Sequence, residues 1–156
     1  ITTPEIKTSE SYIDIKCDKY FDGFELKEAY PYEFSDADGW AVVPLEVTTH
    51  GDVVDYYYDI YVGDLTGDDA PTDNQLILDL AEYGRKNEPI AMSYCYFYEP
   101  LTLVYFAKDG DDNNSVVTRV PMFLYPETAN DLSEFNYYDT QGAAKQFYRR
   151  EFSATR

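Results

Sequence analysis

Residues 54–62 read VDYYYDIYV, and this stretch decides the fold class. Its even-numbered positions carry Val, Tyr, Tyr, Ile and Val, and its odd-numbered positions carry Asp, Tyr, Asp and Tyr. A period of two residues is that of a β-strand, in which successive side chains point to opposite faces of the sheet. We therefore predict a strand whose even-numbered side chains are buried and whose odd-numbered face is in water.

The same alternation recurs along the chain. Residues 41–47 alternate in the same way, and Pro44 marks an edge or a bulge because proline cannot donate a ladder hydrogen bond. Residues 90–98, 102–108 and 115–125 are also predicted as strands. Residues 102–107 are apolar on both faces, which is expected of a strand that is covered on both sides. The turn-forming run DGDDNN at 109–114 lies between two of these strands and predicts a hairpin.

One segment has helical rather than strand periodicity. Thr72 and Gln75 have the Thr-x-x-Gln spacing of a capping box. The apolar residues that follow are spaced three and four apart, and Gly84 stands where a helix commonly ends. We predict a short helix over 73–83.

Several strands and a single helix predict an all-β fold with two packed sheets. The expected domain covers residues 10–126, and residues 127–156 are expected to form a C-terminal extension. Within 141–156 the basic residues outnumber the acidic ones, and the segment QFYRREF fits either a strand or a helix. The basic residues are Lys145, Arg149, Arg150 and Arg156, against Glu151.

The charge balance excludes several functions. The chain has 12 basic and 30 acidic side chains, which give a formal net charge of -18. Such a charge repels phosphate backbones and anionic bilayers, so we expect no nucleic-acid partner and no membrane-surface partner. No apolar run approaches the roughly 18 residues that a membrane span needs, so membrane insertion of this domain is not expected.

Several stretches resemble one family. They are YFDGFELKEAYPYEF (20–34), WAVVPLEVTTHGDVVDYYYDIYVGDLT (40–66), PTDNQLILDLAEYG (71–84), TLVYFAKDGDDNNSVVTR (102–119) and DLSEF (131–135). In content and order they resemble the fibronectin type III-like (immunoglobulin-like) β-sandwich domains of Bacteroides-type cell-surface and secreted proteins.

The resemblance implies a fold, a cellular setting and partners. The fold would be a fibronectin type III-like sandwich with one short inserted helix. Residues 1–9, which begin ITTPEI, look like a linker or the exit strand of a preceding module of the same kind. The native protein would then be a multidomain surface lipoprotein or secreted protein outside the bacterial cytoplasm. Its partners would be neighbouring domains of the same polypeptide, together with an extracellular glycan or protein.

No catalytic pattern stands out. His50 is the single histidine, and it lies in a Thr-His-Gly turn, where a histidine is usually solvated. Nucleophilic catalysis needs a serine or cysteine that is activated by a base, and no such motif is present. We therefore expect no enzymatic activity and no cofactor.

Two acidic clusters are candidates for calcium sites. Asp109, Asp111 and Asn113 have the 1, 3, 5 spacing of a calcium-binding loop, but Asn114 and Val120 occupy the positions of its glycine and glutamate. The other cluster is Asp64, Asp68, Asp69 and Asp73. Turn formation and anions at a helix N-terminus account for both clusters, so no metal is expected.

Cys17 and Cys95 are the two cysteines. They have no metal-ligand or redox spacing, and they fit either a structural disulfide or two buried thiols. We expect two thiols, because disulfide geometry is strict and nothing in the sequence brings the two residues together.

Aromatic side chains give the functional hint. The chain has 17 tyrosines, and Trp40, Tyr57 and Tyr61 are predicted to lie on an outer face. Such rings bury large apolar areas, and sugars stack on them. They would serve either as packing against another element or as a glycan-binding platform. The sequence thus predicts a non-catalytic structural or interaction module, with a carbohydrate-binding module as the alternative.

Overall fold

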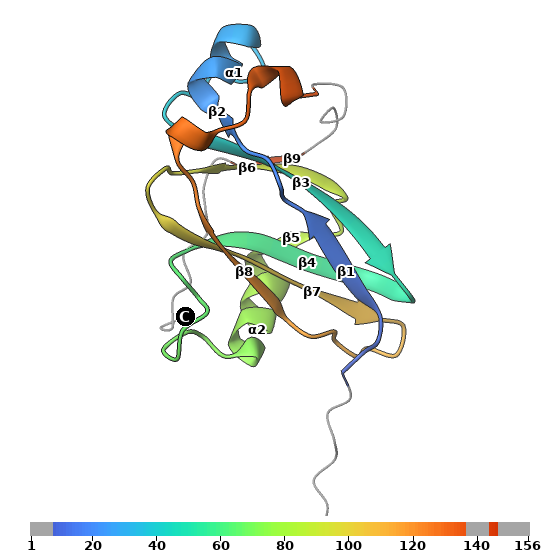
Figure 1. The fold of residues 1–156 in the computed structure, drawn as a ribbon. Coiled ribbons are helices and arrows are strands. Elements are labelled where there is room, and N and C mark those ends of the chain that lie inside the picture. The colour runs from blue at the N-terminus through green and yellow to red at the C-terminus, as the bar shows by residue number, and fades with distance from the viewer. Residues whose placement is uncertain (1–7, 137–143, 147–156) are drawn as a thin grey trace, which may run out of the picture.

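The chain forms two packed β-sheets in the computed structural model, which describes residues 8–136 and 144–146 (Figure 1). Sheet A has the strand order β1-β3-β6-β9, with β2 also paired to β3, and sheet B has the order β5-β4-β7-β8. Sheet A contains β1 (Tyr12–Lys16), β2 (Phe21–Asp22), β3 (Ala41–His50), β6 (Ile90–Cys95) and β9 (Ala144–Gln146). Sheet B contains β4 (Val53–Val62), β5 (Arg85–Lys86), β7 (Pro100–Asp109) and β8 (Thr118–Phe123). The predicted two-sheet β-sandwich is confirmed, but the prediction of a single helix is wrong, because residues 23–29 form a second one.

Adjacent strands pair antiparallel, except that β9 runs parallel to β6. β7 lies between β4 and β8, and its pairing with β8 extends from Tyr105 opposite Thr118 to Pro100 opposite Phe123. The turn after β7 is closed by a 2.9 Å bond from the Asn113 N–H to the Asp109 carboxylate. The hairpin predicted around 109–114 is therefore confirmed.

The main core lies between the sheets. Tyr56, Tyr58 and Ile60 of β4 point into it, as the alternation predicted. Val54 does not, because the pairing register shifts between Val53 and Asp55 and leaves its side chain 56 % exposed. The other buried members of this core are Ile13, Ala41, Val43, Leu45, Ala91, Cys95, Leu101, Leu103, Ala107 and Leu124.

Helix α2 (Asp73–Tyr83) covers the outer face of sheet B, and its bounds are those predicted from the sequence. Thr72 and Gln75 form the expected capping box. Leu76 and Leu80 pack on the outer side chains of β4 and β7, which include Tyr57 and Tyr61. The expectation that the odd-numbered face of β4 is in water is therefore wrong. The helix removes that face from solvent and leaves the Asp59 side chain only 1 % exposed.

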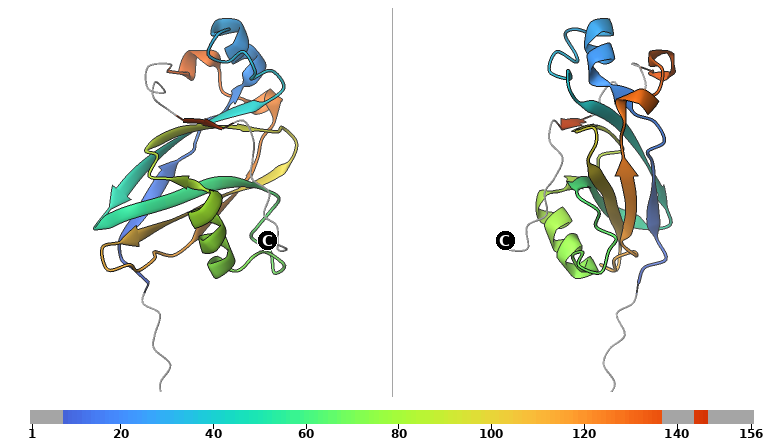
Figure 2. Two further views of the ribbon diagram at one scale, coloured as in Figure 1. Left: turned by 180° about the vertical axis from the view of Figure 1, so that it is seen from behind. Right: turned by 60° about the vertical axis from the view of Figure 1, so that its left-hand side comes forward.

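Part of the outer face of sheet A is covered as well, by helix α1 (Gly23–Ala29) and by aromatic residues from distant parts of the chain. Phe34 and Phe135 meet edge to face, with ring centroids 5.6 Å apart, and both pack with Phe21. Helices α1 and α2 thus lie on opposite outer sides of the paired sheets (Figures 1 and 2). β7 of sheet B is buried on both faces, between the main core and α2, as its two-sided apolar sequence predicted.

Parts of the predicted C-terminal extension join the sandwich. The short 3-10 helices η1 (Pro126–Thr128) and η2 (Leu132–Glu134) follow β8, and Phe135 enters the core beneath α1. β9 then adds a strand beside β6, so residues 144–146 of the segment predicted as strand or helix form a strand. The rest of that segment lies outside the described residues, as do residues 1–7 of the predicted linker or exit strand.

Candidate functional site

The three aromatic residues predicted to form a platform do not come together. Tyr57 and Tyr61 are 7 % and 0 % exposed beneath α2, on sheet B. Trp40 directly precedes β3 of sheet A and is partly exposed. The prediction that Tyr57 and Tyr61 lie on an open face is wrong, because α2 packs on that side of β4 and buries both rings.

Another set of rings does reach solvent, at the end of the sandwich where β3 begins and β6 ends. We call it the aromatic rim and define it as Trp40, Tyr96, Tyr98, Phe123 and Tyr125. Strand register brings these residues to one end, because Ala41 pairs with Cys95 and Pro100 pairs with Phe123. This end is on the left in Figure 1, where the chain turns from β6 into β7.

The sheet A side of the rim is a stacked pair. The Trp40 and Tyr96 rings lie 4.4 Å apart between centroids, at 12°. Tyr94 lies beside Trp40, and its hydroxyl donates to the Asp36 carboxylate at 3.4 Å. Burial, followed by the nearby Asp36 charge, raises the pKa of Tyr94, so this phenol keeps its proton and remains a donor.

Tyr98 lies two residues after Tyr96, and its backbone is unusual. Its φ of 61° lies in the left-handed region, which bulky residues rarely adopt. Its N–H donates to the Leu124 carbonyl at 2.9 Å, and its hydroxyl donates to the Glu127 carboxylate. That bond lowers the pKa of Glu127 and raises the pKa of Tyr98, so the carboxylate stays ionised and the phenol stays protonated. The ring is nevertheless 56 % exposed.

The sheet B side of the rim comes from the end of β8. Tyr125 meets Tyr98 edge to face, with centroids 5.9 Å apart, and meets Phe123 at 4.9 Å and 37°. The Tyr125 N–H donates to the Tyr20 hydroxyl at 3.3 Å. Phe123 and Tyr125 keep exposures of 42 % and 43 %. Two adjacent aromatic side chains are therefore open to solvent on this side.

A shallow hollow adjoins Phe123. It has a volume of about 260 Å³, and Asp64, Pro100 and Pro121 also line it. The Thr66 hydroxyl and N–H both donate to Asp64 Oδ1, which lowers the pKa of Asp64 and keeps it ionised. The hollow thus places a hydrogen-bond acceptor next to apolar ring surfaces.

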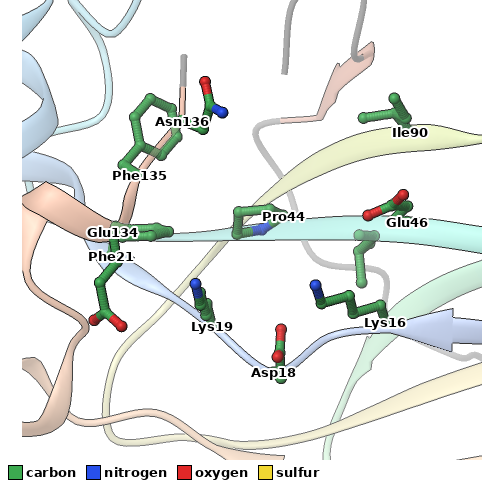
Figure 3. A pocket seen from close by; sticks show the side chains of 11 residues that line it. Lys16, Asp18, Lys19, Phe21, Pro44, Glu46, Ile90, Glu134, Phe135 and Asn136 are labelled. Carbon is green, nitrogen blue, oxygen red and sulfur yellow. The ribbon is translucent and has the colours of Figure 1, made fainter. Parts of the chain in front are cut away.

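A second groove lies on the outer side of sheet A (Figure 3). It has a volume of about 340 Å³, and Pro44, Phe21 and Phe135 supply apolar lining. Lys16 and Lys19 border one side of it, as Figure 3 shows. Asp18, Glu46 and Glu134 also line the groove, so it has no single charge preference. None of its lining residues is a histidine, cysteine or serine.

The catalytic and metal candidates have structural roles. His50 contacts Asp14 at 3.0 Å through Nε2 and stacks on Tyr12 at 4.6 Å. Asp109 accepts hydrogen bonds from Ser9 and from the N–H groups of its own turn. Asp73 pairs with Arg119 at 2.6 Å. Within residues 8–136 and 144–146, no group of three or more His, Cys, Asp or Glu side chains could hold a metal ion.

The two cysteines are thiols, as expected, and no disulfide joins them. Cys95 is buried in the core between the sheets. The Cys17 sulfur lies 3.9 Å from the Met122 sulfur. Burial, and to a smaller extent the Asp18 carboxylate, raise the pKa of Cys17 to about 12. A thiol with such a pKa is a poor nucleophile near neutral pH.

Comparison of the chain with models of protein families, with curated proteins and with solved structures found no match. In the part of the chain that the structure describes, no helix is long and apolar enough to cross a bilayer.

Of the aromatic rim, the sequence predicted only Trp40 as a candidate. Tyr96 and Tyr98 lie in the run YCYFYE, which reads as the end of a strand. Phe123 and Tyr125 alternate with Met122 and Leu124, and this alternation alone does not say which side is open. Three separate segments meet at the rim only because the sheets bring their ends together.

Proposed function

We propose that the chain is a non-catalytic interaction module with a fibronectin type III-like, immunoglobulin-like fold. The strand order carries this proposal. Lettered along the chain, β1, β3, β4, β5, β6, β7 and β8 become A, B, C, C′, E, F and G, and the sheets become A-B-E and C′-C-F-G. Immunoglobulin-like sandwiches keep A, B and E in one sheet and C, F and G in the other, and some add C′ beside C.

The coverage of the sheets supports an interaction role at the ends of the sandwich. Helix α2 covers the outer face of sheet B, and helix α1 covers part of the outer face of sheet A, so the sheet B face is not left for a partner. The Ser9 N–H donates to the Asn114 carbonyl at 2.8 Å, so the chain enters the sandwich beside the β7–β8 hairpin. The ten residues of β7 span about 33 Å between that hairpin and the rim. A module joined through the N-terminal side would leave the rim open.

The proposed setting is a multidomain protein outside the cytoplasm of a bacterium, either as a surface lipoprotein or as a secreted protein. The resemblance in the sequence supports this setting, and the net charge of -18 suits a module that remains in water and does not self-associate. Its first partners would be neighbouring domains of the same polypeptide.

Proteolysis of intact cells tests the proposal. An antibody against residues 8–136 follows the module while whole bacteria that produce the parent protein are treated with a protease. We expect the epitope to be lost from intact cells while a cytoplasmic marker persists. Protection of the epitope until the cells are lysed would overturn the cell-surface setting.

A further inference from the structure

We propose that the aromatic rim binds a neutral saccharide chain, and this inference rests on the proposed function as an interaction module. The rim is the place where several rings remain open to solvent at one end of the sandwich. Sugars present flat apolar C–H faces that stack on aromatic rings, and their hydroxyls donate hydrogen bonds.

Tyr98 occupies a position that stability alone would not give to tyrosine. Residues with φ near 60° are most easily glycine, because a side chain crowds the backbone there. Asn87 and Asp112, the other non-glycine residues with positive φ in the described part of the chain, belong to types that tolerate it. Tyr98 accepts this strain while its ring remains 56 % exposed. Strain that presents an exposed side chain is expected at binding sites.

The carboxylate beside Tyr98 fixes its ring. Glu127 accepts the Tyr98 hydroxyl proton in a hydrogen bond, while the Leu124 carbonyl holds the Tyr98 N–H. Tyr125 then packs against the edge of the Tyr98 ring. Because the Glu127 charge is engaged in holding the phenol, the ring faces are the surface that remains for a ligand. Fixing the rings beforehand reduces the entropy that binding would cost.

The charge around the rim selects an uncharged ligand. The chain carries a net charge of -18, and Glu127 and Asp64 remain ionised at the rim and in the adjoining hollow. Uronate, sulfate and phosphate groups would be repelled there. The Asp64 carboxylate, which lines the adjoining hollow, is an acceptor for hydroxyl donors. A neutral saccharide therefore suits the rim in three ways: its apolar faces can stack on the rings, its hydroxyls can donate to a carboxylate, and it carries no charge that the rim would repel.

Native gel electrophoresis in polysaccharide-containing gels tests the inference. The probes are a mixed-linkage β-glucan, a galactomannan and an arabinoxylan, with polygalacturonate as the anionic comparison. We expect at least one neutral polymer to retard the wild-type chain and polygalacturonate not to. Retardation by none of the neutral polymers, or by polygalacturonate alone, would overturn the inference.

Variants connect the retardation to the rim. Tyr98→Gly removes the ring and suits the backbone, so we expect the fold to persist while the apparent Kd rises about threefold to tenfold. Trp40→Ala and Tyr125→Ala test the two sides of the rim in the same way. The matched control is Tyr12→Ala, which removes a stacked, 46 % exposed ring from β1, opposite His50 at the far end of β3. An equal loss in Tyr12→Ala would overturn the assignment to the rim.

Salt separates a saccharide from a basic protein partner. Binding of a neutral polymer, measured by calorimetry, is expected to be the same at low and high salt, because no ion pair forms. Binding that disappears at high salt would overturn the inference in favour of a cationic ligand. If no polysaccharide retards the chain but the module is accessible to protease on intact cells, the saccharide inference is overturned and the proposed function is not.

Discussion

Tyr61 of β4 donates its hydroxyl to the Asp79 carboxylate of α2 over 2.5 Å, and both side chains are buried. This bond ties the helix to the sheet beneath it. It also gives the Tyr61 hydroxyl a partner inside the molecule, which a buried phenol requires. An aromatic residue that looks exposed by strand alternation is thus part of an internal interface.

Replacement of Tyr61 by phenylalanine tests this bond. Tyr61→Phe keeps the ring but takes a donor from the buried Asp79, so we expect the free energy of unfolding to fall by about 1–3 kcal/mol. Chemical denaturation with urea measures the change. Tyr83→Phe is the matched control, because Tyr83 lies on the same helix and is 48 % exposed. An equal effect in both variants would contradict the role of the Tyr61–Asp79 bond.

Gly23 at the start of α1 is predicted to accept no side chain. A Cβ there would lie 1.9 Å from the Ala37 carbonyl oxygen and 2.6 Å from the Trp40 carbonyl oxygen. We expect Gly23→Ala to lower the free energy of unfolding by about 1–3 kcal/mol, because the backbone has to move. Gly67→Ala, where a Cβ meets nothing within 4 Å, is expected to have little effect. Urea denaturation of both variants measures the difference. A Gly23→Ala protein as stable as the Gly67→Ala protein would refute the close approach of the Gly23 and Ala37 backbones.

Arg119 of β8 is predicted to hold the segment before α2 in place. Its guanidinium donates to the Leu65 carbonyl at 2.8 Å and to the Asp73 carboxylate at 2.6 Å. Arg119→Met keeps much of the side-chain length but removes both bonds. We expect faster amide hydrogen exchange over residues 65–76, as for a local opening made easier by about 1 kcal/mol. Amide exchange in β1 serves as the internal reference. An unchanged exchange rate at residues 65–76 would show that the two Arg119 hydrogen bonds do not hold this segment in place.

The raised pKa of Cys17 predicts a stability that depends on alkaline pH. The pKa of Cys17 is about 12 in the folded protein, against 9.0 for an ordinary thiol. Between these two pH values the folded state therefore binds more protons than the unfolded state. The contribution of Cys17 is complete below pH 9.0 and is lost as the pH rises toward about 12. Urea denaturation across this range, compared with Cys17→Ala, measures it. A difference between the two proteins that does not change with pH would contradict the prediction.

Local signals in the sequence predicted the elements that local interactions determine. The helix at 73–83 follows from its capping box, and the hairpin follows from the turn residues at 109–114. The inward side of β4 follows from alternation at Tyr56, Tyr58 and Ile60. Each of these signals lies within a few residues of the structure that it forms.

Interactions between distant segments account for the rest. α1 has seven residues, without a long apolar repeat, and it is stabilised by packing with Phe135 from the far end of the described chain. Tyr57 and Tyr61 are buried because α2 folds back over β4, and alternation cannot show which face another element will cover. The rim likewise depends on strand register, which places Trp40 beside Tyr96.

The parallel pairing of β9 with β6 has a consequence for synthesis and turnover. Ala91 pairs with Ala144, so the partner strand leaves the ribosome 53 positions later (144 − 91). Until then the backbone of β6 is an open template on which another nascent chain can add a strand. Trimming by a protease before position 144 would recreate that template in the mature protein. The last described strand therefore covers backbone groups of Ala91–Ser93 to which another strand could otherwise pair.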